Sequence, residues 1–380
     1  MVRLRRVDVL AYRSAVSDLA AQQDDPADCA VLDTGVQDTP PGATASRALL
    51  ARVRERSRES VGRLAGDERF AVLHSVRGTM HLHRVADAGL LAAGLRPVDA
   101  DELAVSQQGP YFLGLRDEGM TPGEAFDDVV AAMRSVMADG RSRTKGELSG
   151  AVTSLVDGRL RAWCGGCGVE HVHDGLFRYA TLGAGLAVVV GKDGARFRRL
   201  PSAVAVVGRD QARRVLLRRF LRACGPVGPA RFAAWLGVAV AAAREVWRGV
   251  EPELVAVEVA GWTGWMHQDD VEAVGAAPRP PRLRLLPPYD PLTEIVDREF
   301  AVPDPAERKR IWRASANPGV VLRRGEFAGL WRQRTVARRL VVTVQPFEDL
   351  TGAEVDAAVA DAEAMAELAG LSGARVRLAG

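Results

Sequence analysis

Three consecutive polar residues, Gln37, Asp38 and Thr39, stand between a Gly-Val pair and a Pro-Pro pair. Hydrolysis of an N-glycosidic bond needs a water molecule held against the anomeric carbon and a group that stabilises positive charge developing on the sugar. Carboxylate and side-chain amide oxygens can do both. The same residue types are common in turns, where Asp and Thr cap the helix that follows. From spacing alone, the helix-capping interpretation is favoured.

Two cysteines and two histidines form a second group of residues with chemical potential: Cys164, Cys167, His171 and His173. The pattern C-x-x-C-G is typical of a zinc knuckle, and the histidines could complete a tetrahedral ligand set. Four ligands within ten residues is a tight spacing, so a metal-free turn with two buried thiols is favoured over a structural zinc at Cys164 and Cys167. No thioredoxin-like pattern surrounds them, which argues against a redox role. We expect no metal site and no cofactor required for catalysis.

Two predicted hairpins carry side chains suited to a DNA backbone. In residues 77–84, the alternation of a strand places His81 and His83 on the face opposite Met80 and Leu82. A basic stretch near residues 308–324 is suited to a DNA groove. The candidate DNA contacts are Arg77, His81, His83, Arg313, Arg323 and Arg324. The alternatives are a solvated strand edge for the first hairpin and a solvated surface for the second.

The elements that position these residues follow a pattern that recurs three times: helix, turn, further helix, then two β-rich runs. The middle copy is the clearest, because Thr121 and Thr144 each precede a glutamate by three residues, as in capping boxes. Two capped helices joined by a short glycine-containing turn make a helix-turn-helix. The runs 159–163 and 176–190 are predicted to be strands of the wing.

The first and third copies are looser. The first consists of helices at 7–20, 26–34 and 44–57 and a hairpin at 70–75 and 79–85. The third consists of helices from residue 210 and at 229–236 and 238–247, with strands at 254–259 and 264–267. After a proline-rich stretch, strands at 319–322, 327–332 and 340–345 precede a helix at 351–368.

We therefore expect an α+β chain of three tandem winged-helix modules followed by a small C-terminal β-barrel with a terminal helix. The predicted boundaries are 1–100, 101–205, 206–277 and 278–380. The length of 380 residues fits several modules rather than one core. A net charge of +3 does not exclude nucleic-acid binding, since the distribution of charge matters more.

Several classes of protein are disfavoured by the sequence. No run of about 18 apolar residues predicts a membrane span, and acidic residues soon after the basic N-terminus argue against a signal peptide. Four cysteines in a chain of this length argue against a disulfide framework. We expect a cytoplasmic protein without a membrane partner.

Four segments, in order and spacing, resemble the AlkZ-like family of winged-helix DNA glycosylases. They are residues 35–37, 77–81, 286–292 (LPPYDPL) and 318–331. The resemblance implies winged helices and a barrel wrapped round double-stranded DNA that contains alkylated purines. It implies a monomeric, monofunctional base excision repair enzyme that hydrolyses the N-glycosidic bond of bulky N7-alkylated purines. Such enzymes often give antibiotic producers self-resistance to a DNA-alkylating natural product.

The catalytic signature of this family is Gln-x-Gln or Gln-x-Asp after a glycine and an aliphatic residue. Gln37 matches the first position, whereas Thr39 occupies the second and departs from the signature. The resemblance implies that Gln37 positions the water and that Thr39 assists, with Asp38 as base or electrostatic stabiliser. Two alternatives remain: a dimeric winged-helix transcriptional regulator that reads DNA with the helix at 144–155, or a DNA-lesion-binding protein without turnover.

Overall fold

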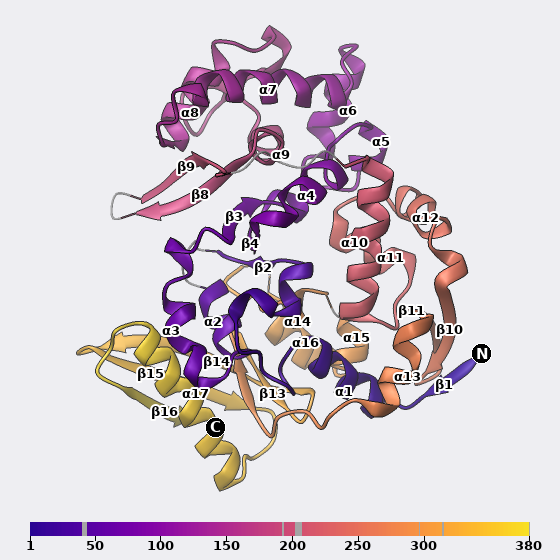
Figure 1. Cartoon of the computed structure of the whole chain (residues 1–380), viewed down its shortest axis with the longest axis vertical. Coiled ribbons are helices and arrows are strands. Elements are labelled where there is room, and N and C mark those ends of the chain that lie inside the picture. The colour runs from indigo at the N-terminus through magenta and orange to yellow at the C-terminus, as the bar shows by residue number, and fades with distance from the viewer. Residues whose placement is uncertain (40–43, 192–193, 202–206, 296, 314, 380) are drawn as a thin grey trace. The chain divides into compact units, whose positions relative to one another are not determined.

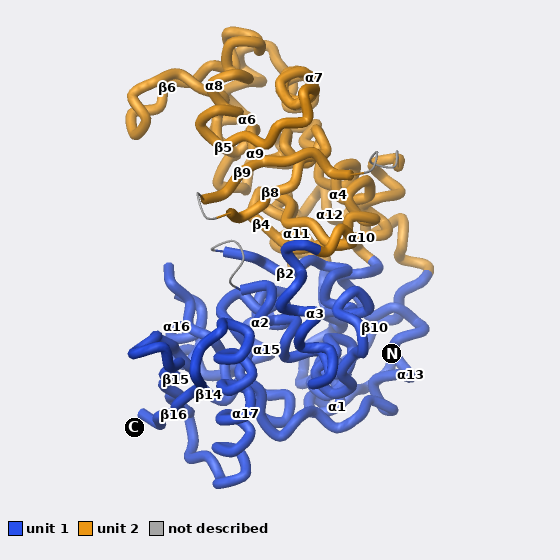
Figure 2. Tube along the Cα trace, turned by 60° about the vertical axis from the view of Figure 1, so that its left-hand side comes forward, with its two compact units in different colours: residues 1–66, 218–228, 253–380 blue, residues 67–217, 229–252 orange. Residues whose placement is uncertain are grey.

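The computed structural model describes residues 1–39, 44–191, 194–201, 207–295, 297–313 and 315–379. The chain falls into two compact units (Figure 2). Unit 1 comprises residues 1–66, 218–228 and 253–380, and unit 2 comprises residues 67–217 and 229–252. Among the described helices, none is long and apolar enough to cross a bilayer.

The first half of unit 1 is a small sheet packed on helices. Its elements are β1 (Val2–Leu4), α1 (Arg6–Val16), β2 (Val36–Gln37), α2 (Ala45–Leu50), α3 (Arg58–Gly62), β10 (Leu254–Val259), β11 (Trp262–His267) and α13 (Gln268–Ala276). Strand β1 pairs in parallel with β10, which pairs antiparallel with β11. Val9 and Tyr12 of α1 are buried against Val257 of β10 and Met266 of β11. The sequence did not predict β1, because three residues are too few to show an alternation.

The second half of unit 1 is a five-stranded sheet with a long helix. Its elements are β12 (Arg284–Leu286), α14 (Pro291–Ile295), α15 (Arg298–Ala301), α16 (Pro305–Ile311), β13 (Gly319–Arg323), β14 (Glu326–Val336), β15 (Arg339–Pro346), α17 (Gly352–Leu368) and β16 (Ala374–Leu378). The strand order is β12-β13-β14-β15-β16, and only the β15–β16 pair is parallel. The helix α17 and the strands β15 and β16 form the yellow part of Figure 1.

The expected C-terminal barrel is not closed over the described residues. Strands β12 and β16 are the two edges of the sheet, so the structure has an open sheet where a barrel was predicted. The physical reason is the helix α17, which packs against β12, β15 and β16. The chain that follows α17 forms β16, which pairs in parallel with β15. The predicted strands at 319–322, 327–332 and 340–345 and the helix at 351–368 are confirmed.

Unit 2 combines a curved antiparallel sheet with several helices. Its strands are β3 (Phe70–His74), β4 (Met80–Arg84), β5 (Arg143–Thr144), β6 (Arg161–Cys164), β7 (Val169–Val172), β8 (Leu186–Gly191) and β9 (Gly194–Arg199). Its helices are α4 (Ala88–Gly94), α5 (Ala100–Leu103), α6 (Gly109–Asp117), α7 (Pro122–Val136), α8 (Lys145–Thr153), α9 (Asp174–Gly183), residues 209–217 of α10 (Arg209–Cys224), α11 (Pro229–Leu236) and α12 (Val240–Arg248). Strands β4-β3-β8-β9-β5 follow one another in one sheet, and β6 and β7 form a separate hairpin.

The helix-turn-helix of the middle copy is confirmed. Thr121 and Thr144 cap α7 and α8, and the backbone amide of each donates the reciprocal bond to the carboxylate of its glutamate. Gly140 takes the left-handed conformation (φ 74°) in the turn between the helices. Leu148 of α8 and Val129 of α7 are fully buried in the same core.

One prediction in the middle copy is wrong. The run 176–190 was expected to be a strand, but its first half is the helix α9, and only Leu186–Gly191 is a strand. The side chain of His173 accepts a hydrogen bond from the amide of Gly175, which caps the helix. Leu176, Phe177 and Ala180 then bury one helical face.

The helices and strands expected in the third copy are confirmed as α10, α11, α12, β10 and β11. The hairpin at 70–85 is confirmed as β3 and β4. In the first copy, the helix expected at 44–57 is too long: α2 ends at Leu50, only a 3-10 turn at Glu55–Ser57 follows within that range, and α3 begins at Arg58. The chain is a mixed α+β protein. Its division into four modules stays a prediction.

Candidate active site and DNA-contact surfaces

The polar turn at residues 37–39 lies at the end of β2, in unit 1. The amide Nε2 of Gln37 donates to the hydroxyl of Thr39 at 3.5 Å, and the Gln37 side chain is only 8% exposed. The hydroxyl of Thr44 donates to the backbone oxygen of Gln37 at 2.9 Å. The structure therefore brings the Gln37 amide and the Thr39 hydroxyl together. Pro40 and Pro41, which complete the predicted turn, lie outside the described residues.

Asp38 caps the helix α2. Its Oδ1 accepts hydrogen bonds from the backbone amides of Thr44 and Ala45, both at 3.1 Å, and lies 3.4 Å from the Thr44 hydroxyl. The positive end of the helix dipole also favours a carboxylate at this position. The helix-capping interpretation is therefore confirmed for Asp38. Among the described residues, no hydrogen bond joins the Thr39 side chain to a backbone amide of α2. Its hydroxyl instead accepts the bond from the Gln37 amide, and its backbone amide donates to the Thr44 hydroxyl.

A buried ion pair holds the region that follows α2. Arg52 donates to both carboxylate oxygens of Asp290 at 2.8 Å, and both side chains are 0% exposed. Arg52 also donates to the carbonyls of Ser17 (2.9 Å) and Ala48 (2.7 Å), so the pair ties α2 to the end of α1 and to the start of α14. Sequence reasoning missed this pair. Its only signal was an aspartate inside the proline-rich segment 286–292.

The histidines of the first hairpin are interior groups. Ser75 Oγ joins them, at 3.0 Å from His81 Nδ1 and 2.9 Å from His83 Nε2. Both side chains are buried, and burial lowers the pKa of His81 well below its ordinary value of 6.5. Burial also lowers the pKa of the neighbouring His74 to about 4. Because both side chains are buried, the structure supports neither the DNA-contact prediction for His81 and His83 nor the exposed-edge alternative.

Arg77 is tied to the protein as well. Its backbone takes the left-handed conformation (φ 58°), and its guanidinium Nη1 donates to the carbonyl of Trp235 at 2.9 Å, near the C-terminal end of α11. A cation at that end of a helix satisfies a free carbonyl and complements the helix dipole. Arg77 therefore has a structural role within unit 2.

The three arginines predicted in the C-terminal region have different surroundings. Arg323 donates to both carboxylate oxygens of the buried Glu354, at 2.8 and 3.1 Å, and lowers the pKa of that residue to about 2. Arg324 lies 3.9 Å from the same carboxylate, with 71% of its side chain exposed. Arg313 is exposed. Arg323 is therefore a structural cation, and Arg313 and Arg324 remain available to DNA.

A stronger basic surface was missed by sequence reasoning. We call it the arginine face, and it consists of Arg332, Arg334, Arg375 and Arg377. The register places Arg334 and Arg375 on either side of Val341, and Arg332 and Arg377 on either side of Thr343, so all four share one face of the sheet. All four are exposed, and within the described part of the chain none of them has an ion-pair partner. The sequence signal for this surface was the pattern R-x-R, which occurs once in β14 and once in β16.

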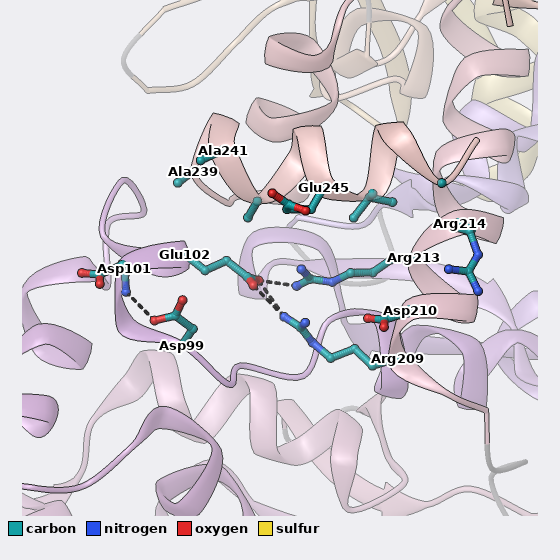
Figure 3. Close-up of a pocket in the computed structure, with 13 residues that line it drawn as sticks. Asp99, Asp101, Glu102, Arg209, Asp210, Arg213, Arg214, Ala239, Ala241 and Glu245 are labelled. Carbon is teal, nitrogen blue, oxygen red and sulfur yellow. Dashed lines mark hydrogen bonds and ion pairs between the residues drawn. The ribbon is translucent and has the colours of Figure 1, made fainter. Parts of the chain in front are cut away.

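Neither of two cavities formed by described residues, one in each unit, has the features of a pocket for a base. In unit 2, a cavity of about 500 Å³ lies between α5, α10 and α12, and its described lining is charged or aliphatic, without an aromatic side chain on which a base could stack (Figure 3). Glu102 at its centre is already paired with Arg209 and Arg213. In unit 1, the cavity beside Leu10 and Phe327 has only about 10 Å³.

A comparison with known families decides what the chain is. The model of the AlkZ-like DNA glycosylases matches residues 31–369, which include the Gln37 turn, the first hairpin and the arginines 332 and 334. The chain belongs to the AlkZ-like DNA glycosylase family. This confirms the resemblance seen in the sequence, and the enzyme is accordingly a DNA glycosylase of DNA repair.

The fold of this glycosylase is similar to that of a solved structure, the Streptomyces sahachiroi DNA glycosylase AlkZ. The two chains share 23% sequence identity, each is covered over 100% of its length, and the TM-score is 0.77. At this identity the likeness concerns the fold. A search of the curated proteins found no match.

Proposed function

We propose that this glycosylase hydrolyses the N-glycosidic bond of bulky N7-alkylated purines in double-stranded DNA. We further propose that it acts as a monofunctional, monomeric enzyme of the cytoplasm that gives self-resistance to a DNA-alkylating natural product. The observation that carries the proposal is the contact between the Gln37 amide and the Thr39 hydroxyl, next to the Asp38 carboxylate that caps α2. Within this proposal, no cofactor is required for catalysis.

Gln37 is the group that positions the water. Because its Nε2 donates to Thr39, its Oε1 is oriented as an acceptor for a water proton. The water oxygen forms a bond with the anomeric carbon and its proton passes to solvent, while the bond to the purine nitrogen breaks and its electron pair leaves with the base. An N7-alkylated guanine already carries positive charge, so its departure needs little protonation. A neutral Gln-Thr pair therefore suffices for this leaving group.

Asp38 acts electrostatically in this proposal. Its Oδ1 already accepts two backbone amides, which fixes the carboxylate next to Gln37 and leaves that oxygen poorly placed to take a proton from water. A fixed negative charge stabilises an oxocarbenium-like sugar without reorganisation during the reaction. We assign the electrostatic role to Asp38 rather than the role of general base.

The finer architecture that we propose keeps three winged-helix modules, with α7 and α8 as the helix-turn-helix of the second. The two capping boxes and the hairpin of β8 and β9 support this assignment. The DNA backbone is held in part by the arginine face, together with Arg313 and Arg324.

Removal of two charges from the arginine face should weaken DNA binding without changing sequence preference. We expect the double variant Arg334→Gln/Arg377→Gln to bind undamaged duplex less tightly, and the slope of log K against log salt to fall by about 0.9 for each phosphate that is no longer neutralised. The measurement is a salt series of binding constants. The matched control is Arg63→Gln, an exposed arginine of the same unit that already pairs with Glu59. A slope equal to that of the wild type would remove the arginine face from the DNA-contact surface.

The size of the adduct can be tested directly. We expect the wild-type enzyme, in single turnover, to release a bulky N7-alkylguanine faster than N7-methylguanine from otherwise identical duplexes, and to leave an abasic site in both. This order of rates follows from the proposed substrate class, and neither of the two cavities described above is a tight base pocket that would exclude a large adduct. Faster release of the methylated base would contradict the bulky-substrate assignment.

A further inference from the structure

The tip of the β6–β7 hairpin in unit 2 gathers three metal-ligating side chains. The ligand atoms of Cys164, Cys167 and His171 all lie within 4.8 Å of one another. Bonds of about 2.3 Å to sulfur and about 2.0–2.1 Å to nitrogen place the ligands of a tetrahedral zinc roughly 3.5–4 Å apart. The side chains therefore need to close by no more than about 1.3 Å to hold an ion of this kind.

The backbone of the hairpin brings these residues together. Cys164 is the last residue of β6, and the amides of Cys167 and Gly168 both donate to its carbonyl, at 3.2 and 2.8 Å. This tight turn requires the positive φ of Gly168 (69°). His171 is opposite Ala162 in the register, so it shares a face with Cys164. The cysteine pair and the histidine consequently point to the same side of the hairpin.

The orientation of the histidine ring suits a metal. His171 Nδ1 lies 2.8 Å from the backbone oxygen of Val172. A carbonyl can only accept, so Nδ1 carries the proton and Nε2 has the free lone pair. Histidines that bind metals commonly donate their other ring N–H to a carbonyl in this way, which fixes the tautomer and the ring.

His173, the other histidine considered from the sequence, is not part of the group. Its ring stacks on Tyr111 with centroids 4.0 Å apart, and its Nδ1 accepts from the Gly175 amide. Asp174 is paired with Lys145 and lies 2.6 Å from Arg178. Neither side chain is free to complete the ligand set, so the described residues supply three protein ligands and leave the fourth position to water.

We propose that Cys164, Cys167 and His171 bind one thiophilic divalent cation of the zinc class, which staples the β6–β7 hairpin. The two-thiolate, one-imidazole set favours zinc over magnesium or calcium, which prefer oxygen ligands. The hairpin needs such a staple because a two-stranded ribbon is only marginally stable by itself. Apart from Val172, which is buried in the core, its strands bury little, with Trp163 68% and Val169 52% exposed. The sequence favoured a metal-free turn, and this geometry favours the alternative.

Cobalt and zinc titrations of the full-length chain test the proposal. Reduced, metal-free protein is titrated with Co²⁺, which reports bound thiolates by charge-transfer absorption, and zinc then displaces it in competition with a chromophoric chelator. We expect one equivalent to bind. The variants Cys164→Ser, Cys167→Ser and His171→Asn should each lose at least about 100-fold in affinity, the upper end of what even outer-shell partners contribute.

The matched control is His173→Asn, since asparagine preserves the cap of α9 and His173 lies outside the set. It should bind the metal as the wild type does.

Zinc should also slow hydrogen exchange of the Cys167 and Gly168 amides, a readout independent of DNA and of base release. Absence of the thiolate–cobalt band, an unchanged affinity in Cys167→Ser, or a Cys164–Cys167 disulfide in protein that binds no metal would each overturn the proposal.

Discussion

The variant Gln37→Ala should lose at least about 100-fold in the single-turnover rate of base release, since one preorganised hydrogen-bonding group in an active site contributes about 10²–10³-fold. The variant should remain folded. Over the described residues, the Gln37 side chain makes one long hydrogen bond, at 3.5 Å, so its removal costs little stability. The measurement is the rate constant for release of an N7-alkylguanine, together with the thermal unfolding midpoint of each protein.

Two neighbouring variants separate chemistry from folding. Thr39→Ser keeps the hydroxyl that accepts from Gln37 and should retain most of the rate, whereas Thr39→Val should not. Asp38→Ala removes both a charge and a helix cap, so it should lose rate and also about 0.5–2 kcal/mol of stability. A Gln37→Ala enzyme that releases the base at the wild-type rate would show that Gln37 does not position the water.

The variant Asp290→Ala should destabilise unit 1 by about 3–5 kcal/mol, because it leaves the buried guanidinium of Arg52 without its counter-ion. The loss should appear in denaturant unfolding as a lower midpoint. Since α2 is held at one end by Asp38 and tied by Arg52 to the rest of the unit, the rate of base release should fall in the same variant.

An exposed ion pair of the same unit provides the control. Asp24 pairs with Arg54 at 3.0 Å and also with Arg56, and half or more of each side chain is in solvent, so Asp24→Ala should change stability by no more than about 1 kcal/mol. The double variant Arg52→Met/Asp290→Leu should recover much of the loss, since it removes both charges. If Asp290→Ala costs no more than Asp24→Ala, the buried pair does not hold this region.

Features with local sequence signals were predicted well. The capping boxes at Thr121 and Thr144 placed α7 and α8, and the glycine turn at residue 78 placed the β3–β4 hairpin. The capping alternative for Asp38 was also visible, because a short polar side chain before a helix has few other local partners. The family signature at Gln37 added a functional interpretation that spacing alone did not favour.

Features that depend on distant parts of the chain were missed. Arg323 looked available for DNA, but its partner Glu354 comes 31 residues later, inside the capping box of α17. The arginine face combines residues of β14 and β16. These strands share a sheet only because the chain after α17 returns and pairs in parallel with β15. His81 and His83 alternated as a surface strip would, yet Ser75 and the surrounding core make them interior. Alternation shows which side chains share a face but not what covers that face.

The most direct test of the proposed activity is a single-turnover assay with a duplex that carries one bulky N7-alkylguanine. The wild-type enzyme should release one equivalent of the intact adducted base per enzyme-bound site and leave an abasic site, without forming a covalent bond to DNA that borohydride traps. Tight binding of the damaged duplex with the adducted base still attached would contradict the proposed activity.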